Sequence, residues 1–184
     1  LDNNVFFNRL GQRVIHILTA LTPAGRTYEI DTRLRPSGNS GFLVTSLQAF
    51  EDYQFKQAWT WEHQALTRAR AVAGNEALQT QFTELRAKVL SQVRSDESLK
   101  KEVHDMREKM RSALVKPRVG EFDLKQGIGG MADIEFIVQY SVLRWAPEYP
   151  DLLTYTDNLR QLEILTRLGL IETEQSTLLR DAYF

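Results

Sequence analysis

Apolar residues recur every three or four positions over most of the chain, which is the spacing of amphipathic helices. The first such stripe, within residues 3–21, comprises Phe6, Leu10, Val14, Ile17 with Leu18, and Leu21. Pro23 and Gly25 follow it and are expected to end the helix.

Residues 26–34 follow a different pattern, in which Tyr28, Ile30, Thr32 and Leu34 alternate with Glu29, Asp31 and Arg33. This period of two predicts a strand with one charged face. A loop of small polar residues is expected at 36–41, and the apolar run at 42–44 is a second candidate strand.

Helical spacing returns after Ser46, which is a plausible N-cap for a helix containing Leu47, Phe50, Tyr53 and Phe55. Further helices are expected at 58–73, around 78–93, around 99–110, at 131–145, at 157–168 and at about 173–184. The long break at 117–130 could include an extended piece at 122–125. Residues 131–145 are apolar on most faces, which is typical of a buried central helix.

The expected fold class is therefore mainly α: a small, incomplete α/β portion at 1–45, followed by a helical bundle at 46–184. A lone strand cannot satisfy its own backbone groups, so its partners must lie upstream or be few and short.

Composition and charge exclude several classes of function. The 184 residues carry a formal net charge of -1, which gives no support to a broad nucleic-acid interface. The absence of cysteine excludes disulfides and thiolate sites and fits a cytoplasmic location. No apolar run is long enough to span a membrane. The chain begins without Met inside a helical pattern, so we expect a segment of a longer protein.

The charged strand face is the first candidate site. Glu29 and Asp31 would lie about 7 Å apart on one face and repel each other unless a cation lies between them. Magnesium, which prefers carboxylate oxygens, fits that position. The alternative is the solvated face of an edge strand.

Glu62 falls on the apolar face of the predicted helix at 58–73, and a buried carboxylate requires a partner. Arg33 or Arg35 is the expected partner, which gives Glu62 a supporting role; alternatively, Glu62 lies at the edge of the stripe and reaches solvent. His63 has no neighbouring ligand-type residue and is expected to be structural.

Asp133 and Glu135 occur in the first turn of the predicted central helix, after Gly129 and Gly130. They would either lie beside an active site or simply favour the helix dipole. The Gly-Gly pair lacks the spacing of a phosphate-binding loop, and no GxSxG motif supports hydrolase chemistry.

Several long motifs resemble the glutamine synthetase adenylyltransferases, enzymes with two related nucleotidyltransferase halves that add AMP to a tyrosine of glutamine synthetase and remove it. The matching segments are YEIDTRLRPSGNSG, AWTWEHQALTRARAVAG, MREKMR, GGMADIEFIVQY and TDNLRQLEIL. The form of the first two resembles the C-terminal, adenylylating half.

The resemblance implies a polymerase-β-like nucleotidyltransferase fold, in which three carboxylates hold magnesium ions around ATP. Asp31 matches the third carboxylate, and Arg33 and Arg35 would meet phosphates or brace Glu62. Glu29 has no assigned role, and Asp133 and Glu135 would open a helix beside the site. The implied partners are glutamine synthetase, the PII signalling protein and glutamine as an effector.

The sequence also departs from the family pattern. The Gly-Ser and Asp-x-Asp elements that carry the other two carboxylates are absent from residues 1–25. The chain alone is therefore expected to be inactive. A non-catalytic helical interaction module is the alternative function. A nucleotidyltransferase acting on RNA or a small molecule is a third possibility, and the near-neutral charge argues against it.

Overall fold

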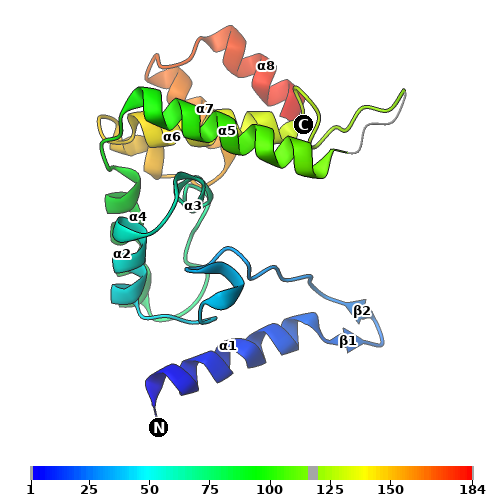
Figure 1. The fold of residues 1–184 in the computed structure, drawn as a ribbon, viewed down its shortest axis with the longest axis vertical. Helices are drawn as coiled ribbons and strands as arrows, with labels where there is room; N and C mark the ends of the chain where they lie inside the picture. The colour runs from blue at the N-terminus through cyan, green and yellow to red at the C-terminus, as the bar shows by residue number, and fades with distance from the viewer. Residues whose placement is uncertain (1, 116–119, 184) are drawn as a thin grey trace. The chain divides into compact units, whose positions relative to one another are not determined.

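The structure is a computed structural model that describes residues 2–115 and 120–183. The chain divides into two compact units, residues 1–58 and residues 59–184, which are described separately (Figure 1). Helices dominate the described residues, and the one sheet among them has two strands of two residues each. The predicted mainly α class is confirmed.

Unit 1 begins with α1, Asn3–Thr19, whose N-cap Asp2 accepts a hydrogen bond from the Asn4 backbone N–H at 2.9 Å. Strands β1, Leu21–Thr22, and β2, Gly25–Arg26, form an antiparallel hairpin. A short 3-10 helix η1, Gly38–Ser40, precedes α2, Leu47–Lys56. The predicted cap is confirmed, since Ser46 Oγ accepts from the Ala49 N–H at 3.1 Å.

The predicted strand at 26–34 is wrong, because Arg26 is its one residue in a strand and the remainder is irregular. The candidate strand at 42–44 is irregular as well. Apart from Arg26, which pairs with Leu21 of β1, neither segment has a neighbouring strand among the described residues. At residues 42–44 a side chain of α1 bonds the backbone instead: the Asn8 amide donates to the Val44 carbonyl at 3.3 Å and accepts from its N–H at 3.2 Å.

Helix α1 approaches residues 43–44 closely at Gly11. A Cβ added at Gly11 would lie 2.9 Å from Val44 Cγ2, closer than side chains pack. Unit 1 continues through α2 to Ala58. The expected division after residue 45 stays a prediction.

Unit 2 contains six α-helices among its described residues. Their bounds are α3, Thr60–Leu66; α4, Glu76–Leu90; α5, Asp96–Leu114; α6, Met131–Trp145; α7, Asn158–Arg167; and α8, Thr173–Tyr183. A 3-10 helix η2, Pro150–Leu153, joins α6 to α7. The helix predicted at 58–73 is shorter than expected, because α3 ends at Leu66. Helix α6 has the predicted bounds. Positions 117–119 of the predicted break and residue 184 lie outside the described residues.

Helix α6 is the centre of unit 2, in contact with α3, α5, α7, α8 and η2. Its buried residues include Ile134, Val138, Val142 and Leu143, which confirms the predicted central helix. Leu162 and Leu165 of α7 pack into the same core with Val138. Burying each such side chain contributes about 1.5–3 kcal/mol.

Unit 1 differs sharply, because none of its described hydrophobic side chains is buried. The apolar stripe of α1 is open to solvent, with Phe6 49%, Leu10 48%, Val14 47% and Ile17 64% exposed. A segment of this size without a core cannot offset its conformational entropy by itself.

Candidate functional site

The predicted metal ligand Asp31 forms an ion pair with Arg33 in unit 1. Arg33 Nε lies 2.9 Å from Oδ1, Nη2 lies 2.5 Å from Oδ2, and the Arg33 backbone N–H donates to Oδ1 at 2.9 Å. These hydrogen bonds to the Arg33 side chain and backbone lower the pKa of Asp31 from 3.8 to about 2. The carboxylate is therefore ionised at neutral pH, as a metal ligand must be.

The other predicted residues of this segment do not join that pair. Arg35 Nη1 donates to the Thr32 carbonyl at 2.5 Å and to its hydroxyl at 3.3 Å. The alternation that would place Glu29 beside Asp31 depends on the strand, and residues 29–31 are irregular.

The residues present fit only part of a magnesium site. No three carboxylate or histidine side chains gather into a possible metal-binding group anywhere in residues 2–115 and 120–183. Both oxygens of Asp31 are bonded to Arg33. The described residues thus supply one candidate ligand rather than a complete site.

Glu62 stabilises the start of α3, because its Oε2 accepts from the Trp59 backbone N–H at 2.9 Å, which satisfies one of the first-turn donors. It is half-buried rather than solvent-exposed. The predicted pairing of Glu62 with Arg33 or Arg35 stays a prediction. His63 is buried, with Nδ1 3.3 Å from Arg94 Nη2, which agrees with a structural role.

Asp133 is a carboxylate of unit 2 with three separate hydrogen-bonding partners. It lies 2.5 Å from Arg107 Nε and 3.0 Å from Arg111 Nη2, and it accepts from the Gly129 N–H at 2.7 Å. Burial raises its pKa, but the Gly129 N–H and the two guanidinium groups outweigh that effect, so the net pKa lies below the usual value. Asp133 ties α5 to the start of α6.

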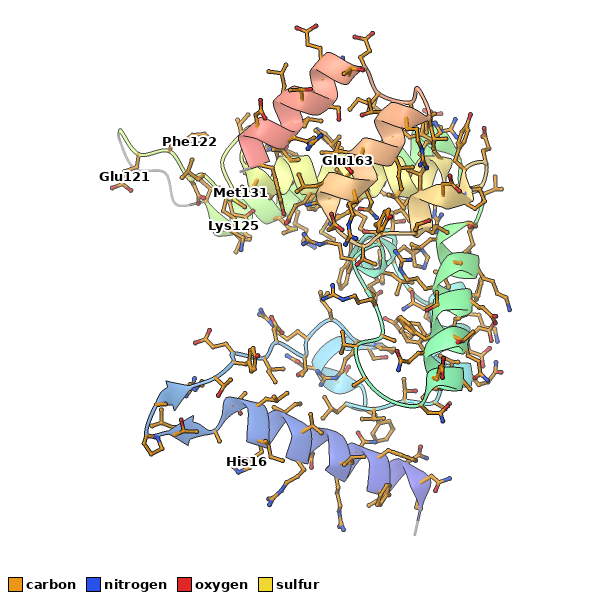
Figure 2. All side chains as sticks on the ribbon, turned by 180° about the vertical axis from the view of Figure 1, so that it is seen from behind. His16, Glu121, Phe122, Lys125, Met131 and Glu163 are labelled. Atoms are coloured by element: carbon orange, nitrogen blue, oxygen red, sulfur yellow. The ribbon has the colours of Figure 1, made fainter. Side chains whose placement is uncertain are left out.

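Arg107 also bonds the loop that precedes α6. Arg107 Nη2 donates to the Gln126 carbonyl at 2.9 Å, and Nη1 to its side-chain oxygen at 3.1 Å. Asp123 accepts from the N–H groups of Lys125 and Gln126, so the loop turns where an extended piece was expected. Figure 2 shows Lys125 and Met131 together at the start of α6.

Glu135 has a separate role from Asp133. Its Oε1 accepts from Arg68 Nη1 at 2.7 Å and from the Tyr183 hydroxyl at 3.2 Å. It therefore connects α6 to the residues after α3 and to the end of α8. Asp133 and Glu135 therefore both bond side chains from outside α6. An argument from the helix dipole alone does not predict these partners.

Sequence reasoning missed the arginines that organise unit 2. Arg107 and Arg111 stand four residues apart in the MREKMR segment, so the i, i+4 spacing could have placed them on one helix face. Arg86 is 4% exposed and donates to the carbonyls of Leu66, Thr67 and Leu153. No sequence pattern marks a partnership of that kind.

A groove of about 640 Å³ runs between α5 and α6. Val103, Phe136, Ile137 and Tyr140 supply its apolar lining, and Arg107, Arg111 and Asp133 lie at one end. It is distinct from the Asp31 segment, which belongs to unit 1.

Comparison with known proteins divides the chain between two family profiles. Residues 1–85 match the family described as Glutamate-ammonia ligase adenylyltransferase, and residues 83–184 match the family described as GlnD PII-uridylyltransferase. The second match covers most of unit 2.

Curated relatives align with the whole chain. Proteins named "Bifunctional glutamine synthetase adenylyltransferase/adenylyl-removing enzyme" are 57% identical in Nitrosococcus oceani, 53% in Hahella chejuensis and 51% in Pseudomonas aeruginosa. The alignments cover 100% of this chain and 19–20% of each relative, so the chain spans about a fifth of their length.

These matches support the predicted resemblance at the level of the family. They do not support the finer assignment to the C-terminal, adenylylating half. Within the described residues, no helix is both long and apolar enough to cross a membrane.

Proposed function

We propose that this chain, which belongs to the glutamate-ammonia ligase adenylyltransferase family, is part of an enzyme that transfers AMP between ATP and a tyrosine of glutamine synthetase. The observation that carries the proposal is the alignment of the whole chain, at 57% identity, with a relative named for both addition and removal of the adenylyl group. In this role the protein regulates nitrogen assimilation.

Asp31 is the proposed metal-binding and catalytic residue. Its carboxylate is ionised, exposed and held by one arginine, and an exposed ion pair of this kind is weak enough to exchange partners. Magnesium, when bound with ATP, would neutralise phosphate charge. Arg33 and Arg35 are the proposed phosphate contacts, and Glu29 the proposed neighbour of the site.

The remaining predicted residues act by supporting the helices. Glu62 holds the start of α3, Asp133 holds α5 against α6, and Glu135 holds α6 to α8 through Tyr183. The proposed partners are glutamine synthetase and a PII signalling protein, with glutamine as effector. The match of residues 83–184 to a family named for PII uridylylation supports the PII partner.

The chain by itself is proposed not to transfer AMP. One carboxylate cannot replace the set that holds a magnesium nucleotide, and residues 2–115 and 120–183 contain no group of three. The self-contained core of unit 2 favours a second candidate function for the chain alone, as a helical module that binds other parts of the enzyme or its protein partners.

The test uses the whole enzyme with Asp31→Asn. Two rates are measured: incorporation of AMP into glutamine synthetase from ATP labelled at the α-phosphate, and loss of the labelled adenylyl group from adenylylated glutamine synthetase. Loss of a metal ligand should lower one of the two rates on the order of 100-fold or more. The affected rate identifies the half of the enzyme to which Asp31 belongs.

Asp52→Asn is the matched control, because Asp52 is an exposed carboxylate paired with Lys56 on α2. Both rates should remain at the wild-type level in this variant. Wild-type values of both rates in Asp31→Asn would overturn the assignment of Asp31. AMP transfer by the 184-residue chain alone would overturn the proposed requirement for additional carboxylates.

A further inference from the structure

The groove between α5 and α6 exposes one stripe of a helix that is otherwise enclosed. Helix α6 is in contact with α3, α7, α8 and η2 as well as α5, and Val138 and Val142 are fully buried. Ile137, in the same helix, is 43% exposed and faces the groove. A helix that is apolar on most faces is expected to be covered on most faces.

The shape of the groove matches a helix. Its lining on α5 extends from Glu97 to Arg111, about 20 Å at 1.5 Å per residue, which corresponds to roughly four helical turns. Two adjacent helices present ridges between which a third helix can pack, and apolar grooves of this form receive amphipathic helices. The apolar lining from Val103, Phe136, Ile137 and Tyr140 would receive the apolar face.

The charged side chains along the groove indicate which kind of helix would bind there. Lys100 and Lys101 are exposed along the α5 side, and His104 follows one turn later. Four lysine and arginine side chains lie in the lining together with three acidic ones, Glu97, Glu108 and Asp133. Arg107 and Arg111 pair with Asp133, and Lys101 pairs with Asp105 at 2.5 Å. The two exposed lysines, Lys100 and Lys101, lie along one edge of the groove, so acidic residues flanking the apolar face of an incoming helix would be favoured there.

We propose that the α5–α6 groove binds an amphipathic helix with acidic flanks, supplied by the same polypeptide from outside these 184 residues. The chain spans 19–20% of the relatives that align with it, so about four fifths of such a protein lies outside the structure. A covalently linked segment binds at high effective concentration, which suits a groove of moderate size. The groove is then an internal interface of the whole enzyme.

Cysteine labelling tests the proposal, because these 184 residues contain no native cysteine. Ile137→Cys is introduced into both the chain alone and the whole enzyme, and the labelling rate at that peptide is measured by mass spectrometry. Leu178→Cys in the chain alone, at a position of α8 that is 64% exposed, supplies the reference rate for an open site. Circular dichroism confirms that the variants retain their helices.

The expected result for Ile137→Cys is labelling near the reference rate in the chain alone and at least about 10-fold slower labelling in the whole enzyme, from exclusion of the reagent. Lys100→Glu with Lys101→Glu should reduce that protection. Equal labelling rates at position 137 in the chain and the whole enzyme would overturn the proposal. Protection that is lost on dilution would also overturn it, since a second copy would then be the occupant. AMP transfer is not measured, so these outcomes are independent of the proposed function.

Discussion

The two units of this chain have similar helical signals in sequence but opposite packing. The α1 stripe of unit 1 and the α7 stripe of unit 2 both have helical spacing, yet Leu10 is 48% exposed and Leu162 is fully buried. The α7 stripe meets α6 within the same 184 residues, whereas the described residues of unit 1 leave every apolar side chain at least partly open. Amphipathicity therefore predicts a helix and does not predict that its partner is present.

The largest expected contrast is in amide hydrogen exchange. In the chain alone, amides of α6 should exchange on the order of 1000-fold more slowly than those of α1, because α6 opens with the core and α1 has no buried contacts to hold it. Peptide-resolved mass spectrometry measures the difference. Equal protection of α1 and α6 would show that unit 1 has a core of its own.

The next largest contrast is expected in the free energy of unfolding when a single leucine of each unit is truncated. Leu162→Ala removes a fully buried side chain and should lower the free energy of unfolding by about 2–5 kcal/mol. Leu10→Ala should change it by less than about 0.5 kcal/mol in the chain alone. Urea titrations followed by circular dichroism give both values, and a large effect of Leu10→Ala would contradict the exposed position of α1.

Removing the charge of Asp133 in unit 2 should likewise cost more stability than removing the charge of Asp31 in unit 1. Asp133→Asn leaves Arg107, 5% exposed, without its anionic partner and should cost roughly 2–3 kcal/mol, because the Asp133 side chain keeps some solvent contact. Asp31→Asn removes an exposed pair and should leave the urea midpoint unchanged.

The pH dependence follows from the lowered pKa of Asp133. A carboxyl whose pKa is lower in the folded state contributes stability above its ordinary pKa, 3.8, and loses that contribution as the pH falls through the folded value. Wild-type stability should therefore fall more steeply below about pH 4 than that of Asp133→Asn. Parallel curves for the two proteins would count against the Asp133 network.

The smallest expected effect is the titration of Asp31. Its pKa should be about 2 in the chain, and Arg33→Gln should return it toward 3.8, because the guanidinium and its hydrogen bonds are removed. Carboxyl chemical shifts measured by NMR between acidic and neutral pH provide both values. The same pKa in both proteins would mean that Arg33 and Asp31 do not pair in solution.

Local signals in the sequence were sufficient for most helices. The bounds of α6 were predicted from its apolar composition between Gly130 and Pro147, and the Ser46 cap from residue type. The strand at 26–34 was wrong because alternation reports a preference for extended backbone, whereas a strand also requires a neighbour to bond. The strand predicted at 42–44 was wrong for the same reason.

The sequence by itself determined which segments are helical, where the central helix lies and to which family the chain is similar, because each depends on residue type and spacing within a segment. Tertiary structure decided the partners of the charges in unit 2: Asp133 with Arg107 and Arg111, and Glu135 with Tyr183. Those pairs join positions up to 48 residues apart. Their formation depends on how helices pack, which no local pattern encodes.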